Sequence, residues 1–259
     1  MRPPLRLLLR PTQRGSLFAR FAVGAAMLAS LVGATGCSAA DSSDLDSARN
    51  GINCDVRLDQ LTIDKLVGIS IVEPTTLRIS PKEKARHLNE LNLLSPDLLD
   101  VYRKHNVPIY LTGGTVTNFR QFSSLRGTTP RGWEGTGYTW DSVPGTGTED
   151  GIFLGDSAKP NNAASLSIHE GTHAIDRSLD FSDRSTPLNE LYREELGRAA
   201  QRLDPNANYR RSNIEEFLAV AVEEYYCNTK TRTNLLQRYP SMHNYVKNSF
   251  SAEVRDRNR

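Results

Sequence analysis

The sequence predicts an α+β fold for one domain that spans residues 52–259. Two short apolar segments with the composition of strands, 107–111 and 151–155, precede a second half in which helical segments dominate. Strands and helices that are segregated along the chain in this way are typical of α+β proteins. The composition, with 38% hydrophobic and 24% charged residues in a chain of 259, is that of an ordinary globular protein.

The first 36 residues have the features of a signal peptide. They contain five arginines and no acidic residue, and an apolar run of 16 residues, 21–36, follows the last arginine. This run is shorter than the roughly 20 residues that cross a bilayer, and small residues crowd its end. We therefore expect residues 1–36 to direct export and then to be removed.

Cys37 stands directly after the apolar run. The sequence Ala34-Thr-Gly-Cys37 resembles a bacterial lipobox, in which the cysteine is lipidated and becomes the mature N-terminus. The alternative is a plain secretory signal that is cut near Ala39 or Ala40 and in which Cys37 is incidental. The first reading predicts a cell-envelope lipoprotein that meets the membrane only through its lipid, and the second predicts a secreted protein.

Residues 37–51 are small and polar, so they cannot bury enough apolar surface to fold and we expect a flexible tether. Beyond residue 36 the chain has 27 basic and 30 acidic residues, and no basic stripe is visible. A nucleic-acid-binding protein would need such a stripe. The charge pattern therefore argues against nucleic-acid binding.

Two helices, two strands and a long loop are predicted in the first half of the domain. Residues 81–105 are helical in character, and Ser95 followed by Pro96 divides them, because serine favours the cap and proline the first helical position. The strand at 107–111 ends at two glycines. Residues 124–151, rich in glycine, proline and threonine, predict a long irregular loop before the second strand.

The second half is predicted to be mainly helical. The expected helices cover residues 165–176, 187–203, 213–227, 233–238 and 241–250. Thr186 is the predicted cap of the second of these helices. Three histidines that stand alone, His87, His105 and His243, are interpreted as surface residues of helices.

Cys54 and Cys227 form an even pair in a chain that is expected to be exported. An oxidising compartment permits them to pair, and a bridge would contribute roughly 2–4 kcal/mol. The alternative is two buried free thiols.

The segment SLSIHEGTHAID, residues 165–176, suggests a metal site. Residues four apart lie on one face of a helix, so His169 and His173 can bind one ion while Glu170 lies beside it. Zinc binds imidazole nitrogen, keeps an open position for water in catalytic sites, and lowers the pKa of that water to about 7. A nearby carboxylate can then take the proton. The alternative is a helix that carries two surface histidines by chance.

A third ligand has to come from elsewhere in the chain. The position ten residues after His169 is Leu179, which rules out the metzincin arrangement, so a glutamate of a later helix is expected. Ser212 and Glu215 fit a capping box, which would occupy Glu215. Glu216 is then free to face inward. The remaining acids of that helix, Glu223 and Glu224, could be solvated or could support a ligand.

The motif HEGTHAID and the later segment YRRSNIEEFLA resemble the anthrax lethal factor-like zinc metallopeptidases. These include the lethal factor catalytic domain and the secreted Pro-Pro endopeptidases. In that family a tyrosine lies seven residues before the glutamate ligand, the spacing of Tyr209 and Glu216, and an aromatic residue follows, here Phe217. The resemblance is strong over residues 165–225.

The resemblance implies a zincin-like domain in which a small sheet packs against the motif helix. It further implies that His169, His173 and Glu216 bind Zn²⁺. Glu170 would be the general base, and Tyr209 would donate a hydrogen bond to the oxyanion. Otherwise Tyr209 is a loop aromatic residue packed on the domain.

One departure from the family concerns the carboxylate that orients an imidazole. Lethal factor has a second glutamate four residues after its ligand, where this sequence has Val220. Imidazoles that bind zinc usually donate their other N–H to a carboxylate or carbonyl. Asp176 is the predicted partner, with Glu223 behind it. The alternative for Asp176 is an ordinary solvated acid at a helix end.

A substrate of this family lies extended beside a strand, whose free edge can accept a peptide. We expect 151–155 to be that edge strand and the protein to be a monomer. The leading hypothesis is an exported zinc endopeptidase. The alternatives are a non-catalytic envelope lipoprotein whose zinc site is structural or vestigial and binds a partner, and a zinc hydrolase of a non-peptide amide such as cell-wall material.

Overall fold

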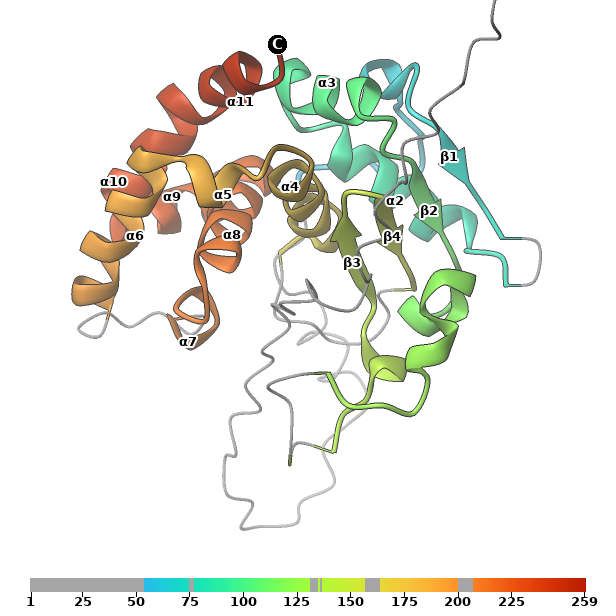
Figure 1. Ribbon diagram of the computed structural model, residues 1–259. Helices are drawn as coiled ribbons and strands as arrows, with labels where there is room; N and C mark the ends of the chain where they lie inside the picture. Colours follow the sequence, from blue (N-terminus) through green and yellow to red (C-terminus); the bar gives the residue numbers. More distant parts are fainter. Residues whose placement is uncertain (1–53, 75–76, 131–134, 136, 157–163, 200–206) are drawn as a thin grey trace, which may run out of the picture.

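The computed structural model describes residues 54–259 except for 75–76, 131–134, 136, 157–163 and 200–206 (Figure 1). The predicted signal peptide, the tether and Cys37 lie outside the described residues. The predicted α+β fold is confirmed, with a small mixed sheet on one side of the molecule and most of the C-terminal helices on the other (Figure 1).

In the described part of the chain, four strands form one sheet in the order β1-β2-β4-β3. The strands are β1 (Ile71–Val72), β2 (Ile109–Leu111), β3 (Gly145–Thr148) and β4 (Gly151–Leu154). The β1–β2 and β2–β4 pairs are parallel, and β3 pairs with β4 in antiparallel register. The expectation that 151–155 is the edge strand is therefore wrong, because β4 has a neighbour on each side. The edge next to the motif helix is β3.

Strand β3 lies inside the segment that was predicted to be a loop. Its sequence, GTGT, has none of the apolar alternation by which strands are recognised, so the loop prediction is wrong for residues 145–148. Its glycines serve close packing instead. A Cβ atom on Gly147 would lie 1.8 Å from the backbone oxygen of Glu170, so only glycine lets the strand approach the helix this closely. The rest of the segment includes the 3-10 turn Trp140–Ser142, whose tryptophan is buried.

The predicted division of residues 81–105 into two helices is confirmed, with α2 at Pro81–Leu91 and α3 at Pro96–Lys104. Both helices begin with proline at a first-turn position. The motif helix α4, Leu166–Leu179, starts at Ser165, whose hydroxyl accepts the N–H of Ile168 at 3.1 Å. Helix α4 packs against β3 and β4 on one side and α8 on the other, so it lies between the sheet and the C-terminal helices (Figure 1).

The described chain after β4 is helical, as predicted, although two caps differ. Its further elements are α5 (Phe181–Arg184), α6 (Thr186–Ala199), α7 (Ala207–Arg210), α8 (Ile214–Cys227), α9 (Thr229–Arg238), α10 (Pro240–Tyr245), a π-helical turn (Val246–Phe250) and α11 (Ser251–Arg257). Asn213, and not Ser212, caps α8, because its side chain accepts the N–H of Glu216 at 2.8 Å. Likewise Ser185, and not Thr186, accepts an N–H of the first turn of α6.

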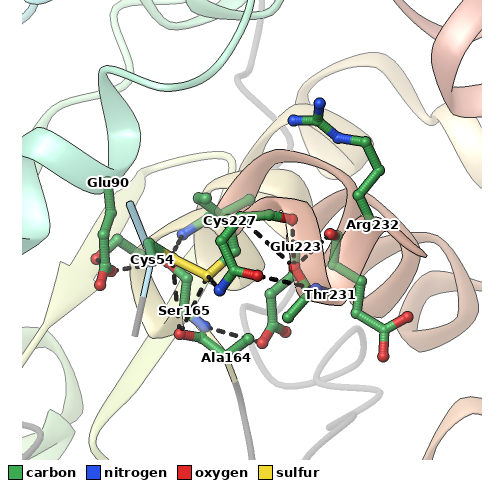
Figure 2. The surroundings of a disulfide bond; sticks show 12 residues. Cys54, Glu90, Ala164, Ser165, Glu223, Cys227, Thr231 and Arg232 are labelled. Carbon is green, nitrogen blue, oxygen red and sulfur yellow. Dashed lines mark hydrogen bonds between the residues drawn. A yellow bond between two sulfur atoms is a disulfide. The ribbon is translucent and has the colours of Figure 1, made fainter. Parts of the chain in front are cut away.

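Cys54 and Cys227 form a disulfide that ties the start of the described chain to the end of α8 (Figure 2). The N–H of Asp55 also donates to the Cys227 carbonyl at 3.0 Å. Both sulfurs lie against the carbonyl of Ala164, directly before the cap of α4. None of the helices in the described ranges has the length and apolar character of a membrane-spanning helix.

Of the three histidines expected on the surface, only His105 is exposed. His243 is largely buried, and His87 is completely buried. One ring nitrogen of His87 lies 2.8 Å from the Ser167 hydroxyl and the other lies 3.0 Å from the Gly155 carbonyl. These partners are distant in the sequence, so nothing near His87 along the chain indicated its burial.

Gly171, within the motif, is required by the packing of α4 on α3. A Cβ atom there would lie 2.6 Å from the Tyr102 hydroxyl and 3.0 Å from a Leu91 methyl group. That hydroxyl is buried and has no hydrogen-bond partner among the described residues. Tyr102 therefore fills the space that a side chain at position 171 would need.

Gly171→Ala is expected to lower the free energy of unfolding by about 1–3 kcal/mol, the usual cost of overpacking a core. Urea unfolding of the metal-free protein measures the change. Adding Tyr102→Phe removes the crowded oxygen and should restore part of the loss. If Gly171→Ala lowers the free energy of unfolding equally with Tyr102 and with Phe at position 102, the strain does not come from the Tyr102 hydroxyl.

Candidate metal centre

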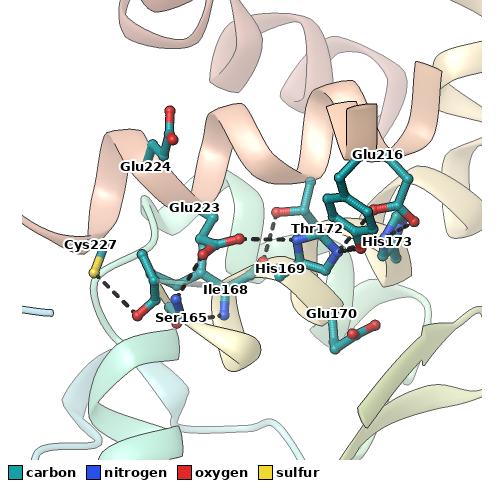
Figure 3. A network of polar contacts seen from close by, with 12 residues as sticks. Ser165, Ile168, His169, Glu170, Thr172, His173, Glu216, Glu223, Glu224 and Cys227 are labelled. Carbon is teal, nitrogen blue, oxygen red and sulfur yellow. Dashed lines mark hydrogen bonds and ion pairs between the residues drawn. The ribbon is translucent and has the colours of Figure 1, made fainter. Parts of the chain in front are cut away.

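His169 and His173 project from one face of α4, one turn apart, as their spacing predicts. Both side chains are buried, and their Nε2 atoms lie 3.2 Å from each other. The helix starts at Ser165, so the two imidazoles fall in its first two turns, where α4 faces α8 (Figure 3).

Glu216 reaches the same point from α8. Because Asn213 caps this helix, Glu216 lies in its first turn, and its carboxylate is completely buried. Its oxygens lie 3.1 Å from Nε2 of His169 and 3.3 Å from Nε2 of His173. Glu215, one residue earlier, points to Arg177 instead. The structure thus brings together the three residues predicted as ligands.

The donor set fits a zinc ion. Ligand atoms about 2.1 Å from one tetrahedral zinc ion lie about 3.4 Å from one another. The separations of 3.1, 3.2 and 3.3 Å between the two imidazoles and the carboxylate are close to that value. In the described ranges these three residues are the group that could hold a metal. Two nitrogens and a carboxylate oxygen are also the ligand types that zinc takes in catalytic sites.

The charges of the three groups depend on one another. Burial alone would raise the pKa of Glu216, but the two imidazoles beside it lower that pKa to about 2. Burial alone would lower the pKa of His169, but the carboxylates of Glu216 and Glu223 outweigh it and raise the pKa well above the usual range. In the metal-free cluster, the pKa shifts favour an ionised carboxylate beside a protonated imidazole. Metal binding would take the place of that proton.

Glu223 holds the other side of His169. Its carboxylate accepts Nδ1–H of His169 at 3.1 Å and the backbone N–H of Ser165 at 2.9 Å (Figure 3). With Nδ1–H held in this way, it is the Nε2 atom of His169 that faces the cluster. Asp176, the other predicted partner, accepts from the N–H and hydroxyl of Ser182 at 2.6 and 3.0 Å. Asp176 thus stabilises the turn after α4, and Glu223 makes the contact to an imidazole that was predicted for Asp176.

Tyr209, on α7, points its hydroxyl into the cluster. The hydroxyl oxygen lies 3.0 Å from Nε2 of His169, and the two rings are stacked with centroids 5.8 Å apart. Burial, together with the carboxylates nearby, raises the pKa of Tyr209 well above its ordinary value. The hydroxyl therefore stays neutral and remains a hydrogen-bond donor.

Glu170 lies beside the cluster but turns toward the sheet (Figure 3). Its carboxylate accepts the backbone N–H of Gly147 at 2.8 Å. On the same strand, the Gly147 carbonyl accepts Nη1 of Arg177 at 2.6 Å. Gly147 and Arg177 were missed in the sequence because β3 has no recognisable pattern, and an arginine at the end of a helix is common.

Comparison with known proteins identifies relatives over most of the described domain. The family model "Anthrax toxin lethal factor, N- and C-terminal domain" matches residues 62–249. This range includes every residue of the cluster and also Glu170, Tyr209 and Glu223.

Two relatives and one solved structure show the extent of the similarity. The chain is 32% identical to a Pro-Pro endopeptidase of Clostridioides difficile over 62% of its own length and 73% of the relative. It is 30% identical to a Pro-Pro endopeptidase of Paenibacillus alvei over 74% of its own length and 87% of the relative. The solved structure of the Paenibacillus alvei enzyme superposes with a TM-score of 0.59 at 28% identity, covering 68% of this chain and 95% of that one.

Proposed function

The chain belongs to the anthrax toxin lethal factor family, and from this premise we propose that it is a zinc-dependent endopeptidase that acts outside the cytoplasm. The similarity to Pro-Pro endopeptidases at 30–32% identity supports a peptidase function. The observation that carries the zinc proposal is the convergence of His169, His173 and Glu216 on one buried point.

The residues around that point have the chemistry of peptide hydrolysis. A bound zinc ion would polarise the substrate carbonyl and lower the pKa of water to about 7. Glu170, whose carboxylate lies outside the ligand set, takes the proton of the attacking water and passes it to the leaving amine. The neutral Tyr209 hydroxyl donates to the oxygen on which negative charge develops. Glu223 keeps His169 in the tautomer that binds metal.

The substrate we propose is an extended peptide bound along β3. This strand is the sheet edge next to α4, and Glu170 already contacts its backbone at Gly147. A strand edge can pair with a peptide through main-chain hydrogen bonds. Because the relatives are named Pro-Pro endopeptidases, the bond between two prolines is the first one to test.

Export is proposed on the signal-like N-terminus, and Cys37 is its proposed lipid anchor if the lipobox reading holds. The Cys54–Cys227 disulfide supports an oxidising compartment. Cell fractionation of the wild type and Cys37→Ser tests both points. If both proteins are exported and neither associates with the membrane, the lipid anchor is contradicted. If the wild type stays in the cytoplasm, export is contradicted as well.

The function is tested by incubating the protein without its signal peptide with a library of peptides, some containing adjacent prolines, and reading cleavage by mass spectrometry. We expect cleavage that a chelator abolishes and added zinc restores. His173→Ala, which removes a ligand, should lose both zinc and cleavage. Backbone N-methylation of a substrate on the side that faces β3 should slow its cleavage. Zinc content without cleavage of any peptide would favour the non-catalytic lipoprotein.

A further inference from the structure

We propose that Glu90, on α2, is a positioning residue for the metal centre, which it reaches through Ser165, Glu223 and His169. The proposal rests on the proposed zinc site and adds a residue outside the motif and outside the helices that carry the ligands. Glu90 is 3% exposed, and its helix α2 packs against α4.

The contacts form a continuous path through the core. Glu90 Oε2 accepts the hydroxyl of Ser165 at 2.7 Å and lies 2.8 Å from the hydroxyl oxygen of Ser167. The backbone N–H of Ser165 donates to Glu223 at 2.9 Å, and the other Glu223 oxygen accepts Nδ1–H of His169. In Figure 2, Glu90 contacts Ser165 from the side of α2 while Glu223 contacts it from α8. Ser165 is thus held between two carboxyl groups, one of which orients a proposed ligand.

The hydrogen atoms of this network can be counted. The Gly155 carbonyl can only accept, so the His87 nitrogen 3.0 Å away carries a proton. If His87 is neutral, its other nitrogen accepts from Ser167, and Ser167 must then accept from a protonated Glu90. If His87 is charged, it donates to Ser167, and Ser167 donates to an ionised Glu90. A neutral His87 beside an ionised Glu90 would leave two acceptors facing each other at 2.8 Å.

Burial favours the first of the two states. It lowers the pKa of His87 to about 3, and the positive charge of Arg86 acts in the same direction. Burial raises the pKa of Glu90, although Arg86 and the two serine hydroxyls act to lower that pKa. Both shifts favour the state in which His87 is neutral and the carboxyl group of Glu90 is protonated toward Ser167. An uncharged group can be buried at lower cost than a carboxylate, and all of its contacts are satisfied.

The path explains why the acid stands at this position. The hydroxyl of Ser165 accepts the N–H of Ile168 and donates to Glu90, so both of its hydrogen-bonding directions are fixed. Its backbone N–H is thereby aimed at Glu223. When the Glu90 contact is lost, Ser165 can still cap α4, but the donor that holds Glu223 is no longer fixed from the side of α2.

The test is the zinc dissociation constant, measured by competition with a chromophoric chelator and independent of catalysis. Glu90→Met keeps the volume and removes both contacts. We expect about tenfold weaker zinc binding, the lower end of the 10–100-fold effect of residues that support a ligand directly. Glu90→Gln keeps the shape, but both hydroxyls contact Oε2, where an amide offers either an oxygen or an NH2 group. It can therefore keep only one of the two contacts, and its zinc affinity should lie between those of the wild type and Glu90→Met. If the methionine variant does not fold, Glu90→Asp replaces it, with weaker binding again expected.

The matched control is Asn89→Ala, one residue earlier on α2. Asn89 is equally buried, but it bonds to the backbone of Thr62 and Gln60, away from α4. It should lower thermal stability and leave zinc affinity unchanged. Equal losses of zinc affinity in Asn89→Ala and Glu90→Met would reduce Glu90 to a structural role and overturn the proposal.

A double-mutant cycle tests the path itself. If Glu90 acts through Glu223, Glu90→Met should weaken zinc binding much less in a Glu223→Ala background than in the wild type. Additive losses would contradict the path. If the wild type binds no zinc, the proposed function fails first. If the wild type binds zinc and Glu90→Met binds it equally well, only this inference fails.

Discussion

Replacing Glu170 by glutamine is expected to abolish cleavage while the zinc content stays unchanged. Glutamine has nearly the same shape, and its carbonyl oxygen can still accept the N–H of Gly147 that the carboxylate accepts at 2.8 Å. It cannot take a proton from water. The position lies outside the group of atoms that converge between α4 and α8, so no ligand is lost. General base catalysis contributes about 10²–10⁴-fold, and we expect a loss of kcat of at least this order.

The measurement pairs peptide cleavage with metal analysis of the same samples. His173→Ala is the contrasting variant, because it should lose zinc and cleavage together. Cleavage by Glu170→Gln within tenfold of the wild type would mean that another group acts as the base. Loss of zinc from Glu170→Gln would mean that the carboxylate belongs to the ligand set, against the present geometry.

The convergence of His169, His173 and Glu216 could be predicted from the sequence because its parts obey local rules. His169 and His173 share a face through helical periodicity alone. Glu216 followed from the exclusion of its neighbours and from a resemblance that fixes its distance from Tyr209. Even here, part of the reasoning was wrong, although Glu216 does meet the two histidines as predicted. Asn213, and not Ser212, caps α8, and both caps place position 216 in the first turn.

The features that escaped prediction depend on contacts between distant parts of the chain. Strand β3 forms because glycine allows it to lie against α4, and no pattern within GTGT reveals this. His87 is buried because Ser167 and Gly155, 80 and 68 residues away, satisfy its ring. The local sequence of β3 is like that of a loop, and the local sequence around His87 is like that of an exposed helix surface. Only the assembled fold shows the difference.

The choice between Asp176 and Glu223 shows the same limit within the site. Asp176 is nearer to the histidines in sequence, yet it caps the turn at Ser182. Glu223 comes from another helix and meets His169 because α8 packs along α4. Distance in the sequence therefore pointed to the wrong partner of His169, because helix packing decides which carboxylate reaches it. The same packing brings Glu223 and Ser165 together, one turn before the end of α8 that carries the disulfide.

The end of α8 is held by the disulfide, and its removal is expected to have the largest effect on stability. Cys54 and Cys227 are 173 residues apart, so the bridge closes a long loop and restricts the unfolded chain strongly. Replacing both by alanine is expected to lower the free energy of unfolding by about 2–5 kcal/mol, measured by urea unfolding of the metal-free protein.

Because this stabilisation acts mainly on the unfolded state, the folded double variant should bind zinc within about threefold of the wild type. The reduced wild type is the control, since it keeps both side chains and lacks the bond, and it should lose stability to a similar extent. Equal stability of the oxidised and reduced wild type would show that the sulfurs are not bridged. Zinc affinity that falls as far as in Glu90→Met would show instead that the bridge aligns Ser165 and Glu223 in the folded protein, where both sulfurs lie against Ala164.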